Sequence, residues 1–292
     1  YVWCFDDDDG VNYDDDDNQD EDDDDGYEGA IVLKASRGIH HEPIAVMDFS
    51  SLYPSSMISE NLSHDSIVLD PIYDNLPGYT YVDVTYEIKK YKDPNKISLG
   101  KETVGEKTCR FAQFPNNEKG VIPQILMHLL KARKTTRAKI KTEPDPFKRA
   151  VLDGMQLAYK ITANSLYGQL GAATSSIYFK DIAASTTAVG RKLLTFAKTF
   201  VEANFEGAET VYGDTDSIFV NFHPTDKDGN SMKGKEALKR SIELGLEAEK
   251  MIGGHLKKPH CLEYEKTFWP FVLFTKKRYV GNKYEMDPDK YK

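Results

Sequence analysis

The stretch Thr210-Val211-Tyr212-Gly213-Asp214-Thr215-Asp216-Ser217-Ile218-Phe219-Val220 carries two carboxylates two residues apart, between runs of β-branched and aromatic residues. Such runs favour strands, so we predict one strand at residues 211–212, a second at 218–220 and a hairpin tip at 213–217. A rigid hairpin tip suits a divalent cation site, because Mg²⁺ and Mn²⁺ prefer carboxylate oxygens. Asp and Gly are also ordinary turn residues, so the stretch taken alone is also explained as a turn without a metal.

A further carboxylate follows a short apolar run much earlier in the chain. Residues 43–49 read as a buried strand that delivers Asp48 to the edge of a sheet. Residues 50–58 predict a tight turn that leads into a helix, with Pro54 in or near the first turn. Backbone N–H groups at such a turn are free, which makes the turn a natural phosphate-binding site.

The middle of the chain predicts two helices, separated by two prolines in residues 143–146. The first spans residues 121–141 and has an apolar face made of Ile122, Ile125, Leu126, Leu129 and Leu130. Cationic residues spaced by four lie together on another side of it: Arg133, Arg137 and Lys141.

The second helix is predicted over residues 147–167, with Leu152, Met155 and Ile161 among its apolar positions. Its polar residues Lys160, Asn164 and Tyr167 share a face. The two helices together predict a positively lined hairpin. Each cationic face by itself is also explained as a solvated surface.

The remaining pattern is less informative about chemistry. Residues 70–114 mix Tyr, Val and Thr with Pro and Gly, and we predict short strands and loops there. Helices are predicted over residues 185–205 and 234–256, and strand-like segments at 263–265 and 279–281.

The charge of the chain is unevenly distributed. The formal net charge is −9, but residues 6–25 hold 14 acidic residues and no Lys or Arg. Without these 14, the 47 acidic residues of the chain fall to 33 against 38 basic ones, so the net charge of the remainder is about +5. We predict that this acidic tract is a disordered loop, because it has too few apolar residues to offset its ordering entropy. A segment that mimics DNA or recruits a basic partner is the alternative. The mildly basic remainder is compatible with a polyanionic partner.

Cysteine usage and hydropathy argue against a disulfide-rich secreted protein and against a membrane-spanning one. The three cysteines lie far apart, which argues against a disulfide framework and a zinc site and suits an intracellular, reducing compartment. The longest apolar run, residues 268–274, is far shorter than a membrane span, so we predict no membrane partner. The chain starts at Tyr1 rather than Met, and we interpret it as a piece of a longer protein.

Three segments taken together resemble motifs A, B and C of the family B DNA polymerases, in the order of that family. They are Asp48-Phe49-Ser50-Ser51-Leu52-Tyr53-Pro54-Ser55, Lys160-Ile161-Thr162-Ala163-Asn164-Ser165-Leu166-Tyr167-Gly168 and Tyr212-Gly213-Asp214-Thr215-Asp216-Ser217. Lys276-Lys277-Arg278-Tyr279 resembles the downstream K-K-R-Y motif of the family. The resemblance covers residues 27–292. Segments 129–134 and 145–149 are similar to DNA polymerase delta, and segments 28–33 and 61–64 to polymerases of large DNA viruses that infect algae.

The resemblance implies an α+β fold: a polymerase palm, which is an antiparallel sheet with packed helices, plus a helical-hairpin fingers subdomain. Residues 1–28 would be an acidic disordered insertion, and 29–120 the first part of the palm with motif A and a strand-rich insertion. Residues 121–172 would be the fingers with motif B, and 173–292 the second part of the palm with motif C and K-K-R-Y. The exonuclease motifs and the thumb are not found in this chain, which suggests a palm-and-fingers fragment.

The implied activity is template-directed DNA synthesis, which transfers deoxynucleotides to a primer 3′-hydroxyl and releases pyrophosphate. The implied cofactor is a pair of Mg²⁺ ions, with Mn²⁺ as the alternative, held by Asp48, the Phe49 carbonyl and Asp216. Asp214 is a third catalytic acid that supports the site or the primer end. Glu263 and Glu265 resemble accessory acids near the metal ions.

The resemblance also assigns residues to the substrates. The nucleotide-binding residues would be Ser51, Leu52, Tyr53, Arg133, Arg137, Lys160 and Asn164. Tyr53 would exclude a 2′-hydroxyl, and Tyr167 and Gly168 would face the nascent base pair. The primer-binding residues would be Lys276, Lys277, Arg278 and Tyr279.

The implied partners are primer–template DNA, deoxynucleoside triphosphates and a processivity factor bound through regions outside this chain. A viral polymerase of this kind would act in the host nucleus or at a cytoplasmic viral replication site. A catalytically inactive nucleic-acid-binding module with a polymerase fold is the alternative. The presence of Asp48, Lys160, Asn164 and Asp216 favours the enzyme. Tyr53 argues against a third hypothesis, a polymerase that uses ribonucleotides.

Overall fold

The computed structural model describes residues 26–92 and 101–292. The acidic tract at residues 6–25 therefore lies outside the described residues. The predicted disordered insertion extended to residue 28, and for residues 26–28 this prediction was wrong. β1 (Gly26–Tyr27) pairs with β5 (Thr80–Tyr91), and Glu28 Oε1 lies 2.8 Å from Lys89 Nζ.

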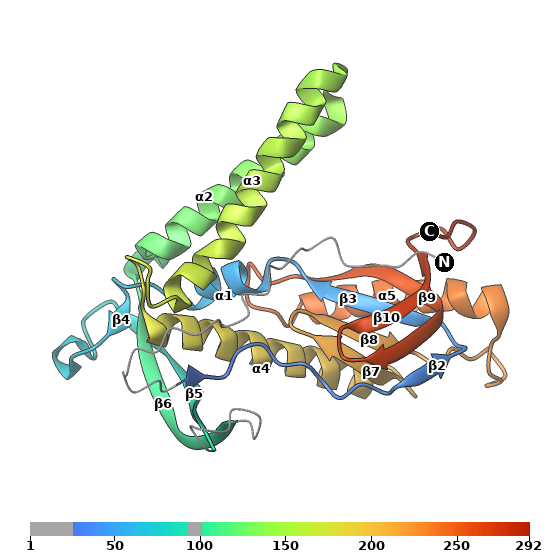
Figure 1. The fold of residues 1–292 in the computed structure, drawn as a ribbon, viewed down its shortest axis with the longest axis horizontal. Coiled ribbons are helices and arrows are strands. Elements are labelled where there is room, and N and C mark those ends of the chain that lie inside the picture. The colour runs from blue at the N-terminus through green and yellow to red at the C-terminus, as the bar shows by residue number, and fades with distance from the viewer. Residues whose placement is uncertain (1–25, 93–100) are drawn as a thin grey trace.

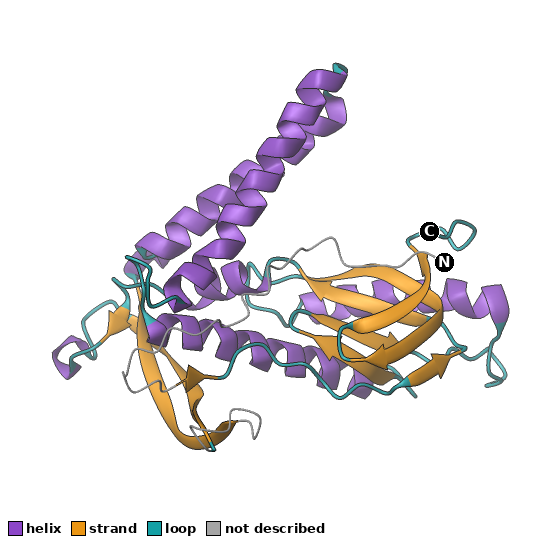
Figure 2. Cartoon of the chain, in the orientation of Figure 1, coloured by secondary structure: helices purple, strands orange, loops and turns teal. Residues whose placement is uncertain are grey.

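An antiparallel six-stranded sheet lies at the centre of the described chain (Figures 1 and 2). β3 occupies an inner position between β8 and β9, and this confirms the predicted antiparallel sheet with packed helices. The strands are, in spatial order, β10 (Arg278–Tyr284), β9 (Leu262–Thr275), β3 (Ile44–Phe49), β8 (Ser217–Asn221) and β7 (Glu209–Asp214), with β2 (Gly38–His40) paired to β9.

The two faces of this sheet are buried in different ways. Helices α4 (Lys180–Asn204) and α5 (Gly234–Gly253) cover one face, where Met47 and Ile218 join the main hydrophobic core. The opposite face carries an aromatic cluster built from Tyr212, Phe219, Phe268, Phe271 and Tyr279. Every residue of β3 except Asp48 is consequently buried, which holds the strand rigidly in place.

A second sheet contains the long hairpin formed by β5 and β6 (Lys101–Gln113), flanked by β1 and β4 (Ile67–Val68). The prediction of short strands here was wrong, because β5 and β6 have 12 and 13 residues. Residues 82–88 of β5 do alternate between apolar and polar side chains, but most of residues 101–108 of β6 are exposed and carry no such alternation, so the full length of the hairpin is not evident from the pattern. Two short 3₁₀ turns, η1 (Pro71–Tyr73) and η3 (Pro115–Asn117), flank it.

Helices α2 (Val121–Thr142) and α3 (Pro146–Gly171) form an antiparallel hairpin that projects from the body of the molecule (Figure 1). Some positions predicted as apolar contacts are exposed, namely Ile125 at 41%, Met155 at 43% and Ile161 at 58%. The helical pattern was right, but each projecting helix has little besides the other to pack against. No described helix is long and apolar enough to cross a membrane.

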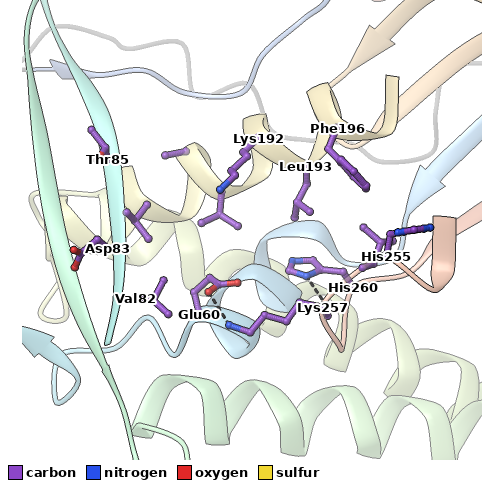
Figure 3. Close-up of a pocket in the computed structure, with 14 residues that line it drawn as sticks. Glu60, Val82, Asp83, Thr85, Lys192, Leu193, Phe196, His255, Lys257 and His260 are labelled. Atoms are coloured by element: carbon purple, nitrogen blue, oxygen red, sulfur yellow. Dashed lines mark hydrogen bonds and ion pairs between the residues drawn. The ribbon is translucent and has the colours of Figure 1, made fainter. Parts of the chain in front are cut away.

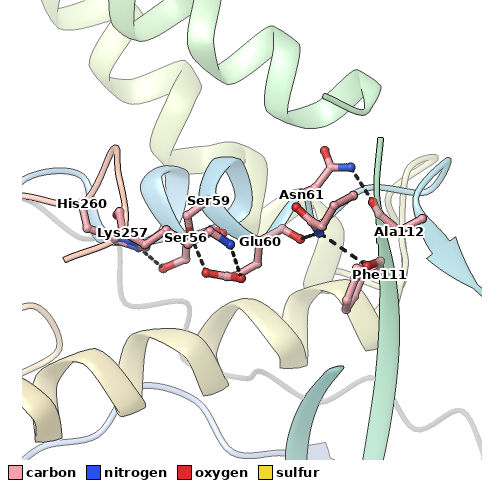
Figure 4. A network of polar contacts seen from close by, with 9 residues as sticks. Ser56, Ser59, Glu60, Asn61, Phe111, Ala112, Lys257 and His260 are labelled. Carbon is pink, nitrogen blue, oxygen red and sulfur yellow. Dashed lines mark hydrogen bonds and ion pairs between the residues drawn. The ribbon is translucent and has the colours of Figure 1, made fainter. Parts of the chain in front are cut away.

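The short helix α1 (Leu52–Glu60) connects the sheet to the helical hairpin and packs against α2, α3 and α4. Asn61 ends it in a left-handed conformation with φ of 57°. The Asn61 side chain donates to the Ala112 carbonyl at 2.8 Å (Figure 4). It also accepts from the Gly120 N–H at 2.8 Å. The C-terminal end of α1 is thereby fixed to β6 and to the start of α2.

Candidate active site

Acidic residues from three strands meet at one edge of the central sheet. Antiparallel pairing places Asp48 of β3 opposite Ser217 of β8, and the Phe49 N–H donates to the Asp216 carbonyl at 2.8 Å. On the other side of β3, Glu263 of β9 lies opposite Asp48. Asp48 and Asp216 are distant in sequence, yet the register of three strands makes them neighbours.

The β7–β8 hairpin turns through only Thr215 and Asp216, a shorter tip than the sequence predicted. Thr215 is left-handed with φ of 52°, and its N–H donates to the Ile31 carbonyl at 3.1 Å. A Cβ on Gly213 would lie 2.6 Å from Leu33 Cδ1, so glycine is needed for this close packing. The segment around Leu33 thus supports the hairpin from outside.

The carboxylate of Asp214 is engaged by neighbouring side chains. The Tyr212 hydroxyl donates to Oδ2 at 3.0 Å, and Thr215 Oγ1 donates to Oδ1 at 3.1 Å. Lys277 Nζ lies 3.5 Å from Oδ1, and the Lys277 N–H donates to the Tyr212 hydroxyl at 2.8 Å. These contacts join the turn between β9 and β10 to the acidic hairpin and give Asp214 an evident structural role.

The four residues predicted to bind the primer do not share one environment. Lys276, Lys277 and Arg278 are exposed at the β9–β10 turn, and Lys276 Nζ donates to the Val32 carbonyl at 3.1 Å. Tyr279 is half-buried, and its ring packs against the aromatic cluster, 5.2 Å from the ring of Phe219. The cationic side chains are therefore accessible, whereas Tyr279 contributes to the sheet face.

The N-terminus of α1 lies directly after Asp48 and Phe49. Ser51 precedes the helix in a left-handed conformation, with φ of 51° and ψ of 59°, and its side chain makes no capping hydrogen bond. The first N–H groups of a helix have no partner within the helix, and they carry a partial positive charge. The backbone N–H groups of Ser51, Leu52 and Tyr53 therefore lie at a helix start whose partial charge suits an anion, a few residues after Asp48.

Tyr53 packs against motif B rather than standing alone. Its ring lies 4.6 Å from the ring of Tyr167, and the Tyr167 hydroxyl lies 3.4 Å from the Tyr27 hydroxyl. Burial, together with the nearby charge of Asp216, raises the pKa of the Tyr53 hydroxyl to about 12. No sequence pattern marked Tyr27, which follows the acidic tract and reaches α3 only through the tertiary fold.

The polar residues of the helical hairpin differ in exposure. Arg133 and Lys160 are half-buried, and Arg133 Nε lies 3.4 Å from Gln156 Oε1 of the facing helix. Arg137 and Asn164 are exposed. A Cβ on Gly168 would meet no described atom within 4 Å, so protein packing does not explain this glycine.

The donor atoms at the sheet edge fit a hard divalent cation. Within residues 26–92 and 101–292, no three His, Cys, Asp or Glu side chains gather closely enough to hold a metal by themselves. The available donors are oxygens of Asp48, Asp216 and the Phe49 carbonyl, which suits Mg²⁺ or Mn²⁺. Mg²⁺ is commonly held by one or two carboxylates together with substrate phosphates, so a bound triphosphate would complete this set.

The two acids of β9 have different neighbours. Glu263 is exposed opposite Asp48. Beyond this pair, the β3–β9 register shifts between Val46 and Met47. Glu265 Oε1 lies 3.3 Å from Nζ of Lys266, whose side chain is only 7% exposed. Glu263 therefore lies nearest to the motif A strand, and Glu265 is involved with a buried cation.

Comparisons with known proteins agree on one family. A model of DNA polymerase family B matches residues 10–292. The DNA polymerase of Pyramimonas orientalis virus is 52% identical and matches 91% of this chain, and the DNA polymerase delta catalytic subunit of Oryza sativa subsp. japonica is 38% identical and also matches 91%. A solved family B DNA polymerase from the hyperthermophilic archaeon Pyrobaculum calidifontis superposes with a TM-score of 0.58 at 30% identity, covering 91% of this chain. The chain spans 25%, 22% and 29% of those proteins, respectively.

Proposed function

Because this chain belongs to DNA polymerase family B, we propose that it is the nucleotidyl-transfer core of a template-directed DNA polymerase. Its substrates would be primer–template DNA and deoxynucleoside triphosphates. The observation that carries the proposal is the meeting of Asp48 and Asp216 at adjoining strand ends, directly before the N-terminus of α1. In this proposal the central sheet with α4 and α5 is the palm, and the α2–α3 hairpin is the fingers.

Asp48, Asp216 and the Phe49 carbonyl would hold two Mg²⁺ ions, or Mn²⁺ in their place. Such ions make the primer 3′-hydroxyl more acidic and neutralise charge on the triphosphate and on the leaving pyrophosphate. The hydrogen bond between the Phe49 N–H and the Asp216 carbonyl joins the two backbone segments that carry these carboxylates. Asp214 keeps the turn in shape through Tyr212 and Thr215.

The incoming nucleotide binds between α1 and the helical hairpin. The N–H groups of Ser51, Leu52 and Tyr53 donate to the triphosphate oxygens. Cationic and amide side chains of the hairpin add to this binding, and they are Arg133, Arg137, Lys160 and Asn164. The Tyr53 ring, supported by Tyr167, lies under the sugar and excludes a 2′-hydroxyl.

Primer–template DNA binds across the acidic sheet edge. Tyr167 and Gly168 face the nascent base pair, and the open space beside Gly168 allows a base pair to approach the helix backbone. The β9–β10 turn binds the primer backbone without sequence preference, through Lys276, Lys277 and Arg278, with Tyr279 holding the turn against the sheet.

We also infer a viral replicative polymerase, because the viral relative is 52% identical and the delta catalytic subunit 38%. Such an enzyme acts in the host nucleus or at a cytoplasmic viral replication site. A processivity factor would bind through other parts of the longer protein.

The test is primer extension by the full-length natural protein on a defined template. We expect addition of the complementary deoxynucleotide in Mg²⁺, no addition of a non-complementary one, and loss of activity after chelation. A protein that binds the same DNA tightly but extends no primer in Mg²⁺ or Mn²⁺ would contradict the proposal. That outcome would support the inactive binding module.

A further inference from the structure

The helix that carries the proposed phosphate-binding amides is held along its length by one loop segment, residues 257–261, which lies between α5 and β9 (Figure 4). The segment reaches the start, the middle and the end of α1. The Ser50 N–H donates to the Cys261 carbonyl at 2.9 Å, Ser56 Oγ lies 3.2 Å from His260 Nε2, and Glu60 Oε2 lies 2.8 Å from Lys257 Nζ.

A cavity of about 630 Å³ lies beside this segment, between α4, β5 and the end of α1 (Figure 3). Glu60, Lys257 and His260 all line it, together with apolar residues such as Leu193 and Phe196. The side chains that line this cavity have no protein atoms facing them across it, so they gain no dispersion attraction there. On this side, therefore, polar contacts rather than close apolar packing hold α1 to the loop.

Of the two basic side chains that the loop segment places against α1, His260 is much more buried than Lys257. It is 2% exposed and Ser56 is 0% exposed, whereas the Lys257 side chain is 52% exposed. A half-exposed ion pair contributes little, since water screens it, but a buried hydrogen bond is costly to break. The link between His260 and Ser56 is thus the strongest candidate for fixing α1.

The hydrogen-bond pattern defines the state of the ring. His260 Nδ1 lies 2.9 Å from the Lys257 carbonyl, which can only accept, so Nδ1 carries a proton. In the neutral ring Nε2 is an acceptor, and the Ser56 hydroxyl has one proton, which it donates either to Nε2 or to the Leu52 carbonyl. Burial lowers the pKa of His260, which favours this neutral form. The Leu52 carbonyl, 2.9 Å from Ser56 Oγ, is the other acceptor within reach of that hydroxyl.

We propose that His260 is a positioning residue that fixes α1 through Ser56 and thereby sets the triphosphate-binding amides and the Tyr53 ring. This inference rests on the proposed function of α1. Ser51 has no side-chain cap at the helix start, so contacts farther along α1 add to the Ser50–Cys261 hydrogen bond in setting the position of the first turn. A shift of α1 moves the anion site and the sugar-excluding ring together.

The experiment compares His260→Ala with His255→Ala in the full-length natural protein. His255 is a matched control, because it lies in the same connection between α5 and β9 and lines the same cavity, but its ring packs at a tilt against Phe200 of α4, with the ring centroids 5.1 Å apart. Single-nucleotide incorporation gives KM and kcat for a deoxynucleotide and its ribonucleotide counterpart. For His260→Ala we expect KM for the deoxynucleotide to rise about tenfold, the scale of one lost buried hydrogen bond, and sugar discrimination to fall. His255→Ala should stay within about twofold of the unmodified protein.

Hydrogen exchange of the α1 amides, residues 52–60, supplies a readout that needs no polymerase activity. Exchange should accelerate in His260→Ala and in the milder Ser56→Ala, but not in His255→Ala. Equal exchange and equal KM in the two histidine variants would overturn the inference while leaving polymerase function intact. If the unmodified protein extends no primer, the proposed function fails, and exchange still decides whether His260 fixes α1. If His260→Ala does not fold, Ser56→Ala decides the question.

Discussion

The acidic edge of the central sheet and the projecting α2–α3 hairpin contribute to one proposed site in opposite ways. In β3, Ile44 and Met47 are fully buried, and Asp48 is bracketed by strands on both sides. In α3, Leu157 is 48% exposed and Ile161 is 58% exposed, and the helix projects away from the core (Figure 1). The sheet edge is fixed by backbone pairing, whereas the hairpin has few contacts besides its own two helices, α1 and α4.

This difference assigns separate tasks to the two regions. Metal-bound chemistry requires carboxylates held to within a fraction of an ångström, which a buried sheet can supply. Phosphate neutralisation tolerates longer and more mobile cationic side chains, which a projecting hairpin can supply. Four tests probe this division, from the largest expected effect to the smallest.

The first test compares the two aspartates of the hairpin turn. Asp216→Asn should lower the rate of primer extension about a thousandfold, because removal of a metal-binding charge costs several kcal/mol of transition-state stabilisation. Asp214→Asn should lower it about tenfold or less, since Asp214 is engaged by Tyr212, Thr215 and Lys277. Single-turnover extension in Mg²⁺ measures both rates. Equal losses would show that the two acids do not have separate roles.

The second test concerns the cationic face of the hairpin. Lys160→Met should lower kcat/KM for the nucleotide about 50-fold, the scale of a lost hydrogen bond to a charged group. Lys148→Met is the control, because Lys148 is exposed near the other end of the same helix. It should change kcat/KM by no more than about twofold. Steady-state titration of the nucleotide distinguishes the two, and similar losses would indicate a general charge effect.

The third test concerns the contact between the two regions, where Tyr53 meets Tyr167. Tyr53→Ala should raise ribonucleotide incorporation at least about tenfold, because the ring that excludes the 2′-hydroxyl is removed. Tyr53→Phe keeps the ring and should keep the exclusion.

The raised pKa of Tyr53, about 12, predicts that the hydroxyl stays neutral over the range in which the assay is run. A phenol with a raised pKa stays protonated below that value, so sugar discrimination should be constant from about pH 7 to pH 9. Competition between the two nucleotide types, followed by alkaline cleavage of the product, measures discrimination. A loss of discrimination in Tyr53→Phe, or a change across this pH range, would assign the effect to the hydroxyl.

The fourth test uses two glycines of α3. A Cβ on Gly168 or on Gly154 would meet no described atom within 4 Å. Either glycine replaced by Ala should raise the free energy of unfolding by about 0.5–1 kcal/mol, because Ala has the higher helix propensity. Only Gly168→Ala should also slow extension, by a few-fold, since its methyl group would meet the nascent base pair. Thermal unfolding and extension assays measure the two effects, and unchanged extension in Gly168→Ala would place the base pair elsewhere.

Local sequence patterns predicted most helices and the acidic hairpin, because their signals lie within a few residues. The structure confirms helices near residues 121–141, 147–167, 185–205 and 234–256, though α4 begins five residues earlier, at Lys180. The strand-like segments at 263–265 and 279–281 are parts of the longer β9 and β10. The full length of the β5–β6 hairpin was missed, because residues 101–108 of β6 are mostly exposed and carry no alternation, even though residues 82–88 of β5 do alternate.

Some contacts could not be predicted from the sequence, because they join residues that have no shared local pattern. Tyr27 reaches Tyr167, and His260 reaches Ser56, each across more than a hundred residues. The engagement of Asp214 by Lys277 likewise depends on where the β9–β10 turn lies relative to β7. These contacts change the interpretation of individual residues, but the family assignment does not depend on them.

The sequence by itself determined which chemical groups are present: acids after apolar strands, amides at a helix start, and cations along helical faces. Only the tertiary structure decided which of these groups lie close together. It alone also placed the loop at residues 257–261 against α1. The physical reason is that propensity and periodicity act over a few neighbouring residues. Strand register and side-chain packing are set by the whole core at once.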